Sequence, residues 1–344
     1  MSVDTAFIED LRQFASLEPA WNTLVRRSAT GTCHSTFEWL YTWWKHFGSG
    51  RRLFLVTACE NGTLAGIAPF FVDARIPGAE CLHFLGQGLS DYADLVVPCG
   101  RQDVAEALLH ALLQRQAEWK AVDLEEVPAD SPYQMQLERL AKTVDADACW
   151  VPTVRCPYLP IEGTWDAFFR SRGGGFRHNI QNKLNRCRRD GVPLRYVDRM
   201  SVTNTFIDEI VDLSARRQKT DGHRSPFLNH PDQEFLRGVL PLMSDRGMLR
   251  ISEVRVGNSL GGFALAFCWQ RTMYDWNTQY DPRYAAYSLG RIALAHLAKS
   301  AFEEKYAEFD FMRGEEGYKF QWTSLARSNV ALRSAASCGD RGGT

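Results

Sequence analysis

Apolar and polar residues follow a hairpin-like pattern twice along the chain, once in each half. Residues 53–72 (LFLVTACENGTLAGIAPFFV) and 249–269 (LRISEVRVGNSLGGFALAFCW) each contain two apolar runs on either side of a short polar turn. The turns hold Asn61-Gly62 and Gly257-Asn258, and tight hairpins select such pairs because their turns need positive φ. The pattern predicts two strands joined by a tight turn at each place.

The two hairpins correspond to each other in sequence. A shift of 196 residues aligns Leu64 with Leu260, Gly66 with Gly262, Ala68 with Ala264, and Phe71 with Phe267. In the first half a strand-like stretch (81–97), an amphipathic helix (103–119) and a short strand (121–127) follow. In the second half a strand (273–281), a helix (288–305) and a short strand (308–312) follow. The shared order predicts two copies of one α/β unit with a crossover helix.

Between the two copies lies a strongly basic segment. The segment 170–189 contains Arg170, Arg172, Arg177, Lys183, Arg186, Arg188 and Arg189. The three glycines at 173–175 predict an initial loop, followed by a basic helix up to Gly191. Two interpretations stay open. The segment is either a solvated helix face or a wall that faces phosphate, since the planar guanidinium group suits phosphate oxygens.

Composition and charge narrow the class of protein. The chain has 344 residues, enough for about two domains, and is 45% hydrophobic and 24% charged. The formal net charge of -1 attracts neither nucleic acid nor an anionic membrane, so any anion site must be local. Nine cysteines show no zinc-ligand spacing, so we expect no metal. The acidic start and the lack of a long apolar run predict a cytoplasmic protein without a membrane span.

Two stretches of the second half carry candidate chemistry. In NTQYDPRYAAYSLGRIAL (277–294) a strand leads into a helix that Ser288 is expected to cap. Gly290 would let a ligand approach the backbone, Arg291 would add a charged donor, and free helix N–H groups bind anions. The alternative is an ordinary capped helix.

The other stretch is FDFMRGEEGYKFQW (309–322), where an apolar strand is followed by a charged loop. Arg313, Glu315, Glu316, Tyr318 and Lys319 fall within seven residues, bracketed by aromatic side chains that should hold them against a core. Loops at strand ends often carry function because a rigid sheet positions them. The alternative is a charged surface turn.

These two stretches resemble the hallmark motifs of the CelD-like (cellulose biosynthesis) acetyltransferases of the GNAT superfamily, which are distantly related to the FemAB transferases. FEWLYTWWKHFG (37–48) and FLGQGLSDYADLVV (84–97) resemble the first half of that family, so the resemblance spans about residues 15–325. It implies an α/β (α+β) protein of tandem duplicated GNAT folds, each a mixed, mostly antiparallel sheet with flanking helices. The implied domains are 1–150, without a cofactor site, and 151–336, with the donor site, followed by a flexible tail at 337–344.

The resemblance also implies an activity. An acyl group would pass from acyl-CoA (acetyl-CoA), a co-substrate and not a permanently bound cofactor, to an amine or hydroxyl. The acceptor would be a sugar or a cell-envelope or exopolysaccharide precursor, in association with the polysaccharide synthesis machinery. The loop that binds the pyrophosphate would comprise Tyr287, Ser288, Leu289, Gly290 and Arg291. This loop departs from the usual GNAT pattern at Tyr287 and at Ile292.

Acyl transfer needs an uncharged nucleophile, stabilisation of an oxyanion and a proton for the leaving group. Tyr318-Lys319 resembles the Phe-Lys pair at the reaction centre of Fem-type transferases. We expect Lys319 and Arg313 to supply positive charge, and Glu316 or Asp310 to accept the proton. The reserve candidates for the base are Asp275 and Asp281.

The first half offers candidates for the acceptor site. Asp91, Tyr92 and Asp94 follow the Gly-Gln-Gly loop, and we expect them to line a cleft between the halves and contact the acceptor. The alternative is that they are turn residues.

Two other functions stay open. The first is a Fem-like transferase that takes its acyl group from aminoacyl-tRNA, and the basic 170–189 segment fits it. Outside this alternative we expect no nucleic-acid partner. The second is a non-catalytic scaffold of a polysaccharide synthase. Salt-sensitive RNA binding would favour the first, and failure to bind any acyl donor would favour the second.

Overall fold

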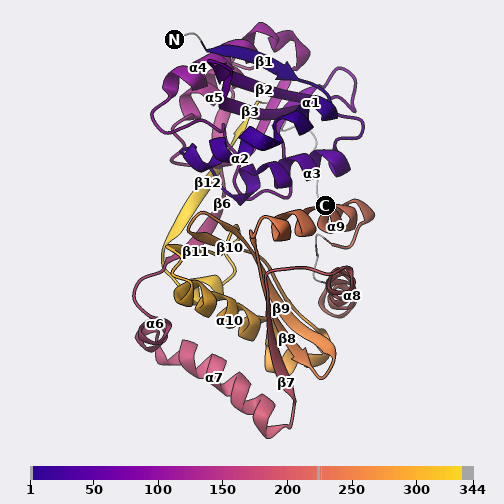
Figure 1. The fold of residues 1–344 in the computed structure, drawn as a ribbon, viewed down its shortest axis with the longest axis vertical. Helices are drawn as coiled ribbons and strands as arrows, with labels where there is room; N and C mark the ends of the chain where they lie inside the picture. Colours follow the sequence, from indigo (N-terminus) through magenta and orange to yellow (C-terminus); the bar gives the residue numbers. More distant parts are fainter. Residues whose placement is uncertain (1–2, 223–224, 226, 335–344) are drawn as a thin grey trace. The chain divides into compact units, whose positions relative to one another are not determined.

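The computed structural model describes residues 3–222, 225 and 227–334. These residues form two compact units, each with its own hydrophobic core (Figure 1). The first unit comprises the chain up to Arg155 and the chain from Arg327 onward, and the second comprises Cys156–Ala326. The sequence predicted a boundary between residues 150 and 151. The observed division differs from it mainly because the last strand of the chain pairs with a strand of the first unit. The expected tail at 337–344 lies outside the described residues.

The sheet of the first unit has the strand order β1-β2-β3-β4-β5-β12. Its strands are β1 (Asp4–Ile8), β2 (Arg52–Glu60), β3 (Thr63–Asp73), β4 (Cys81–Phe84), β5 (Ala121–Pro128) and β12 (Ala326–Arg333). Its helices are α1 (Leu11–Ser16), α2 (Glu18–Arg27), η1 (Cys33–Ser35), α3 (Phe37–Phe47), α4 (Gln102–Gln114), η2 (Gln116–Glu118) and α5 (Gln134–Ala141). The pair β4–β5 is parallel, and the other neighbouring strands are antiparallel.

The sheet of the second unit has the strand order β6-β11-β10-β9-β8-β7. Its strands are β6 (Cys149–Pro160), within which the division falls, β7 (Leu194–Arg199), β8 (Leu249–Val256), β9 (Ser259–Trp269), β10 (Thr272–Tyr280) and β11 (Glu308–Asp310). Its helices are α6 (Trp165–Ser171), α7 (Gly174–Arg189), α8 (Asn204–Asp221), α9 (His230–Asp245), η3 (Pro282–Tyr287), α10 (Leu289–Glu303) and η4 (Lys319–Gln321). The pair β10–β11 is parallel, and the other neighbouring strands are antiparallel.

Helices cover both faces of the second sheet. Along β9, Ala264, Ala266 and Cys268 belong to the core that α10 completes. The alternate residue Phe263 contacts Phe206 of α8, because successive side chains of a strand point to opposite faces. Figure 1 accordingly shows α10 on one side of β8 and β9, and α8 and α9 on the other. A strand buried on both faces explains why β9 is apolar along nearly its whole length.

The internal repeat is present in the strand register as well as in the sequence. In the first hairpin Ala58 pairs with Gly66 and Cys59 pairs with Leu64, so a bulge falls at Ala65. In the second hairpin Val254 pairs with Gly262 and Arg255 with Leu260, so the bulge falls at Gly261. The aligned bulges, each followed by the same order of strand, helix and parallel strand, show two copies of one unit.

The aligned glycines receive the crossover helices. A Cβ on Gly66 would lie 2.4 Å from Val104 Cγ1 of α4, and one on Gly262 would lie 2.9 Å from Gly290 N of α10. Each helix therefore packs against its sheet at a point where only glycine leaves room. The predicted fold class, two α/β units with mixed, mostly antiparallel sheets and flanking helices, is confirmed.

Three local predictions differ from the structure. The predicted strand 81–97 is a strand only over Cys81–Phe84, because Gly86 and Gly88 adopt φ of 88° and 89° and turn the chain, and Val96 returns to form an isolated bridge with Ile67. The helix predicted at 103–119 ends at Gln114 and gives way to the short 3-10 helix η2. The predicted Gly173–175 loop is shorter, since α7 already begins at Gly174.

Within the described ranges, every helix is too short or too polar to cross a lipid bilayer.

Candidate active site

In the second unit, two parallel strands separate after a short pairing. β10 and β11 pair only from Thr272 with Glu308 to Tyr274 with Asp310. Beyond this point β10 continues to Tyr280 with a bulge between Asp275 and Asn277, while the chain after β11 turns away. The turn uses positive φ at Met312 (60°) and Gly314 (118°). The divergence leaves room at the strand ends for side chains from both segments.

A small, partly open pocket lies beside the chain that follows β11. Three segments form its wall: α7 with Phe176, Asn179 and Ile180, α10 with Arg291 and Leu294, and the chain after β11 with Tyr318, Gln321 and Trp322. All three segments belong to the second unit. The pocket therefore joins the basic helix to both stretches that the sequence marked as candidates for chemistry.

The start of α10 differs from the expected cap. Ser288 occupies the N-cap position, but in a left-handed conformation (φ 52°, ψ 47°) and without a capping bond from its side chain. The expected capping by the Ser288 hydroxyl is therefore wrong. The Ser288 carbonyl accepts bonds from Arg291 N and Ile292 N, whereas the first amides of any α-helix have no acceptor within the helix.

The five residues expected to bind pyrophosphate occupy different environments. Arg291 is exposed and lines the pocket, and Ser288 and Tyr287 are partly exposed. Leu289 and Gly290 are buried. A Cβ on Gly290 would lie 2.9 Å from Gln279 O, so the glycine allows close packing of α10 on β10. This packing by itself requires a glycine at position 290.

Asp275 is the buried acid at the bulge of β10. Its side chain accepts a hydrogen bond of 2.9 Å from Thr278 Oγ1. Burial raises the pKa of Asp275 to about 7, against the bond from Thr278 and the charge of Lys319, while the charge of Glu316 raises it further. The carboxyl group can therefore accept or release a proton near neutral pH.

Lys319 is buried within the loop that follows β11. Its Nζ donates to Arg313 O at 2.6 Å and to Met312 O at 3.4 Å, and lies 3.0 Å from Glu316 Oε2. An ammonium group has three donors, so these three oxygens engage all of them. In this structure Lys319 thus holds the loop together and places its charge close to Asp275.

Glu316 rests on a glycine of the same loop. A Cβ on Gly314 would lie 2.3 Å from Glu316 Oε2, which is closer than any real contact of this kind. The absence of a side chain at residue 314 therefore gives the carboxylate the position from which it reaches Lys319. The Glu316 side chain is still 57% exposed, so the same carboxylate is open to solvent.

Tyr318 lines the pocket and keeps its proton. Burial raises the pKa of Tyr318, and the charges of Asp275 and Glu316 raise it further. Arg217 and Arg291 oppose this rise without cancelling it. The phenol therefore stays a hydrogen-bond donor at every physiological pH.

Two other expected acids have internal partners. Asp310 is buried, and its Oδ1 accepts a bond of 2.7 Å from Met312 N in the tight turn. Asp281 is fully buried and lies 2.7 Å from Arg283 Nη2 and 3.1 Å from Arg216 Nη2. Burial alone would raise the pKa of Asp281, but the bonds from Arg283 and the charge of Arg216 hold it below its usual value. These contacts give Asp281 a place in an ion cluster outside the pocket lining.

Arg313 contributes its carbonyl to the Lys319 contacts, and its side chain is partly exposed. Glu315 is exposed.

In the first unit, Asp91, Tyr92 and Asp94 are buried. Asp91 N donates to His34 Nδ1 at 3.1 Å, and Tyr92 and Asp94 line a small pocket that also includes His34. Asp94 accepts bonds from Ser131 Oγ at 2.5 Å and from Leu95 N at 2.8 Å. Burial raises the pKa of Asp94 to about 7. These residues are therefore packed inside the first unit, in the loop between β4 and α4.

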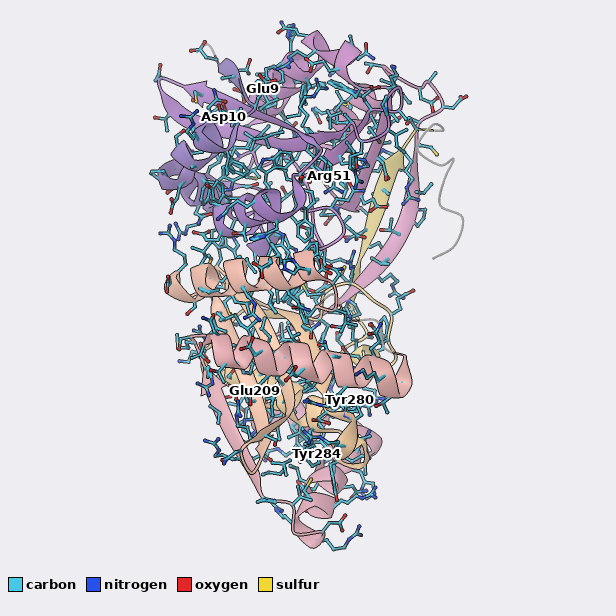
Figure 2. The ribbon with its side chains drawn as sticks, turned by 90° about the vertical axis from the view of Figure 1, so that its right-hand side faces the viewer. Glu9, Asp10, Arg51, Glu209, Tyr280 and Tyr284 are labelled. Carbon is cyan, nitrogen blue, oxygen red and sulfur yellow. The ribbon has the colours of Figure 1, made fainter. Side chains whose placement is uncertain are left out.

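The sequence did not identify several residues around the site. No sequence pattern pointed to Asn179, Gln321 or Thr278. Arg217 lies in α8, which the sequence did not predict. Arg217 packs its guanidinium group 4.6 Å from the centre of the Tyr280 ring, and Figure 2 shows Tyr280 next to α8. The run of basic residues at 216, 217 and 219 was the available signal for Arg217.

Residues 174–320 match a family described as the acetyltransferase (GNAT) domain. Among solved structures, the chain is similar to FemX, with 11% identity over 95% of this chain and 96% of that chain, and a TM-score of 0.65. It is also similar to a conserved protein of unknown function from Bacteroides thetaiotaomicron (11% identity, 97% and 100% covered, TM-score 0.58). A further similar structure is the C-terminal domain of a putative lysylphosphatidylglycerol synthetase from Agrobacterium fabrum (11% identity, 94% and 93% covered, TM-score 0.55).

At such identities these likenesses concern the fold alone. No curated protein matches the sequence. The matched GNAT segment runs from the first residue of α7 to the loop of Tyr318 and Lys319, so it contains the whole pocket wall except Gln321 and Trp322. The match supports an acyltransferase.

Proposed function

We propose that this protein is an acyltransferase that moves an acyl group from acyl-CoA to an amine or hydroxyl of a sugar or cell-envelope precursor. One observation carries the proposal. A single pocket joins Arg291 at the start of α10 to Tyr318, and the charge of Asp275 acts directly on that phenol. An anion-binding element and a proton-transfer pair thus meet at the point where β10 and β11 separate.

The donor would bind with its pyrophosphate at the start of α10. Arg291 is exposed there and forms no ion pair with any acid in the described part of the chain. The first helical amides add partial positive charge, and a helix N-terminus favours phosphate. The apolar members of the pocket wall, Phe176, Leu294 and Trp322, suit the uncharged arm of the donor.

The chemistry would use two groups with separated pKa values. The acceptor attacks the thioester carbonyl and passes its proton to Asp275 or Glu316, while the thiolate leaves and takes a proton from Tyr318. Transfer of a proton from the acid back to the Tyr318 oxygen restores the starting state. Asp275 suits the role of base because its pKa is about 7, and Glu316 because its carboxylate is exposed. Asp310 suits it less, since it holds the backbone of Met312.

Lys319 would act as a positioning residue. Its ammonium group fixes the loop from Met312 to Glu316, and its charge opposes the rise of the Asp275 pKa. Arg291, and not Lys319, then has the unengaged positive charge that faces the pocket.

The acceptor is proposed from the CelD-like resemblance, which points to exopolysaccharide or cellulose biosynthesis. The buried residues Asp91, Tyr92 and Asp94 of the first unit remain proposed acceptor contacts.

Isothermal titration with acetyl-CoA and with a longer acyl-CoA tests the donor. We expect binding by the wild type and about tenfold weaker binding by Arg291→Ala, since a charge-assisted contact to phosphate is removed. Lys299→Ala is the matched control, because it removes one positive charge from the same helix away from the pocket. Absence of binding by the wild type, or equal loss in both variants, would contradict the proposal.

A second candidate is a Fem-like transferase that uses aminoacyl-tRNA. The exposed cationic residues of α7, among them Arg177, Arg188 and Arg189, favour it, as does the fold likeness to FemX. Binding of a tRNA acceptor-stem duplex that weakens steeply with salt, without binding of acyl-CoA, would support this candidate. Absence of binding to either donor would support a scaffold role.

A further inference from the structure

One side of α7 presents polar and cationic residues next to the pocket. Phe176, Ile180, Leu184 and Cys187 face the core of the second unit. Beside this apolar face, Asn179, Lys183 and Arg186 follow one another at the four- and three-residue spacing that aligns side chains on a helix. We call these three residues the α7 stripe. It begins at the pocket wall with Asn179 and runs along α7, which Figure 1 shows as a long helix of the second unit.

The two cations of the stripe converge on a single acceptor. Lys183 Nζ donates to Ala286 O at 3.2 Å, and Arg186 Nη1 donates to the same oxygen at 3.4 Å. Ala286 lies two residues before Ser288, so both charges are next to the loop that enters α10. Like charges held on neighbouring turns of a helix repel each other, and one neutral carbonyl does not compensate for them.

In the described part of the chain, the acid that pairs with a cation of the stripe is Asp190. Asp190 Oδ2 lies 3.6 Å from Arg186 Nε, but Asp190 also binds Arg189 and accepts a bond from the Tyr287 hydroxyl. No salt bridge connects a described acid to Lys183 or to Arg291. Lys183 and Arg186 therefore have Asp190 as their acidic neighbour, and Arg189 also engages that carboxylate, although the whole chain carries -1.

The α7 stripe is also long enough for a ligand to place a second phosphate on it, apart from the pyrophosphate at the start of α10. Seven residues separate Asn179 from Arg186, which corresponds to about 10 Å along the helix. At its far end the Arg186 guanidinium group lies 5.6 Å from the centre of the Tyr287 ring, so a planar aromatic surface accompanies the charge. A ligand that enters the pocket with one end can thus extend along α7 and place an anionic group at Lys183 and Arg186.

We propose that Lys183 and Arg186 form a subsite for a phosphomonoester of the acyl donor, which in acyl-CoA is the ribose 3′-phosphate. The subsite rests on the proposed function and is separate from the pyrophosphate site at Arg291. A phosphomonoester carries between one and two negative charges near neutral pH, so it would relieve the repulsion between the two cations. The loop departs from the usual GNAT pattern at Tyr287, and the stripe would supply cationic donors beside that position.

Titration with acetyl-CoA and with 3′-dephospho-acetyl-CoA tests the subsite. We expect the wild type to bind acetyl-CoA about tenfold more tightly than the dephospho form, because two charge-assisted contacts depend on that phosphate. The double variant Lys183→Ala/Arg186→Ala should bind both donors with the affinity that the wild type has for the dephospho form. Arg188→Ala should keep the preference, since Arg188 lies on the opposite side of α7 from Arg186.

The outcomes separate the two proposals. Equal binding of both donors by the wild type, or a preference that survives in the double variant, overturns the subsite while the donor function stands. Binding of neither donor by the wild type overturns the donor function and the subsite together. If the double variant instead loses binding of an RNA duplex while its donor preference is unchanged, the stripe is an RNA contact and the subsite is wrong. Each variant should have the same midpoint of thermal unfolding as the wild type, which verifies that its fold is intact.

Discussion

Replacement of Asp275 by asparagine separates the stability of the candidate active site from its acid–base chemistry. The carboxyl group is buried beside Thr278, and asparagine keeps both its shape and an oxygen that accepts the threonine bond. The amide cannot ionise, so the variant imitates the protonated form of Asp275 at every pH. Any difference between variant and wild type that changes with pH therefore reports the ionisation of this one group.

The size and sign of the effect follow from the pKa. The folded state keeps the proton of Asp275 up to about pH 7, whereas the ordinary pKa of an aspartate side chain is 3.8. The folded state binds more protons between these values, so the free energy of unfolding of the wild type falls as pH rises through this window. At about 1.4 kcal/mol per pH unit the loss approaches an upper value of about 4 kcal/mol above pH 7. Asp275→Asn should escape this loss.

Denaturant unfolding at pH 4, 5, 6, 7 and 8 measures the difference. We expect Asp275→Asn and the wild type to be equally stable at pH 4, and the variant to be more stable by a few kcal/mol at pH 8. Asp281→Asn is the control with the opposite sign. In the wild type the pKa of Asp281 is lowered. The ion pairs of Asp281 therefore stabilise the wild-type fold at neutral pH, and this stabilisation is lost as pH falls through the lowered pKa. If stability of Asp275→Asn has the same pH slope as the wild type, the raised pKa is wrong.

The same variant tests the mechanism. If Asp275 is the base, the kcat/KM of the wild type should rise with pH to a plateau above about 7, because the carboxylate must be ionised to accept a proton. Asp275→Asn should lose this rise together with most of the turnover. A variant that is more stable at pH 8 and fully active would show that Glu316, and not Asp275, accepts the proton.

Two further predictions concern the loop after β11. Gly314→Ala should displace the Glu316 carboxylate from Lys319, because the new Cβ would lie 2.3 Å from Oε2, and should lower turnover. It should also lower the free energy of unfolding by about 1–3 kcal/mol, because alanine is strained at φ 118°. Gly317→Ala, where a Cβ has open space and φ is not positive, should change neither, and equal effects of the two substitutions on turnover and on thermal unfolding would refute this reasoning. Tyr318→Phe should reduce kcat by about 10²–10⁴-fold while titration shows unchanged donor affinity, because only the proton donor is lost. Unchanged kcat would remove Tyr318 from the mechanism.

Much of the fold could be predicted from the sequence because its signals are local. Asn61-Gly62 adopts positive φ at both residues, and Gly257 adopts it at the second turn, as the hairpin pattern required. The alignment of Gly66 with Gly262 predicted a repeat, and the structure has a bulge at the same aligned place in both hairpins. The prediction of a strand over 81–97 was wrong for a local reason as well, since Gly86 and Gly88 turn the chain after Phe84.

The candidate site was predictable only in part. The sequence identified Arg291 and Tyr318 as candidate site residues in two separate stretches. It also identified the basic segment 170–189, but it did not predict where this segment lies in the fold. Sequence spacing also suggested the same importance for Asp281 as for Asp275. The structure distinguishes them: Asp281 is enclosed by Arg216 and Arg283, whereas Asp275 is a buried acid with a pKa near neutrality.

The sequence by itself determined the two hairpins, the repeat and the types of residue available for chemistry, because hydrophobic periodicity and turn residues act over a few positions. Only the tertiary structure brought Asn179, Arg291 and Tyr318 into one pocket, although more than a hundred residues separate the first two. Only packing converted Asp275 into a group that titrates near pH 7, because a pKa depends on loss of water and on charges from distant segments. Burial and proximity arise when the helices pack on the sheet, and no local pattern encodes them.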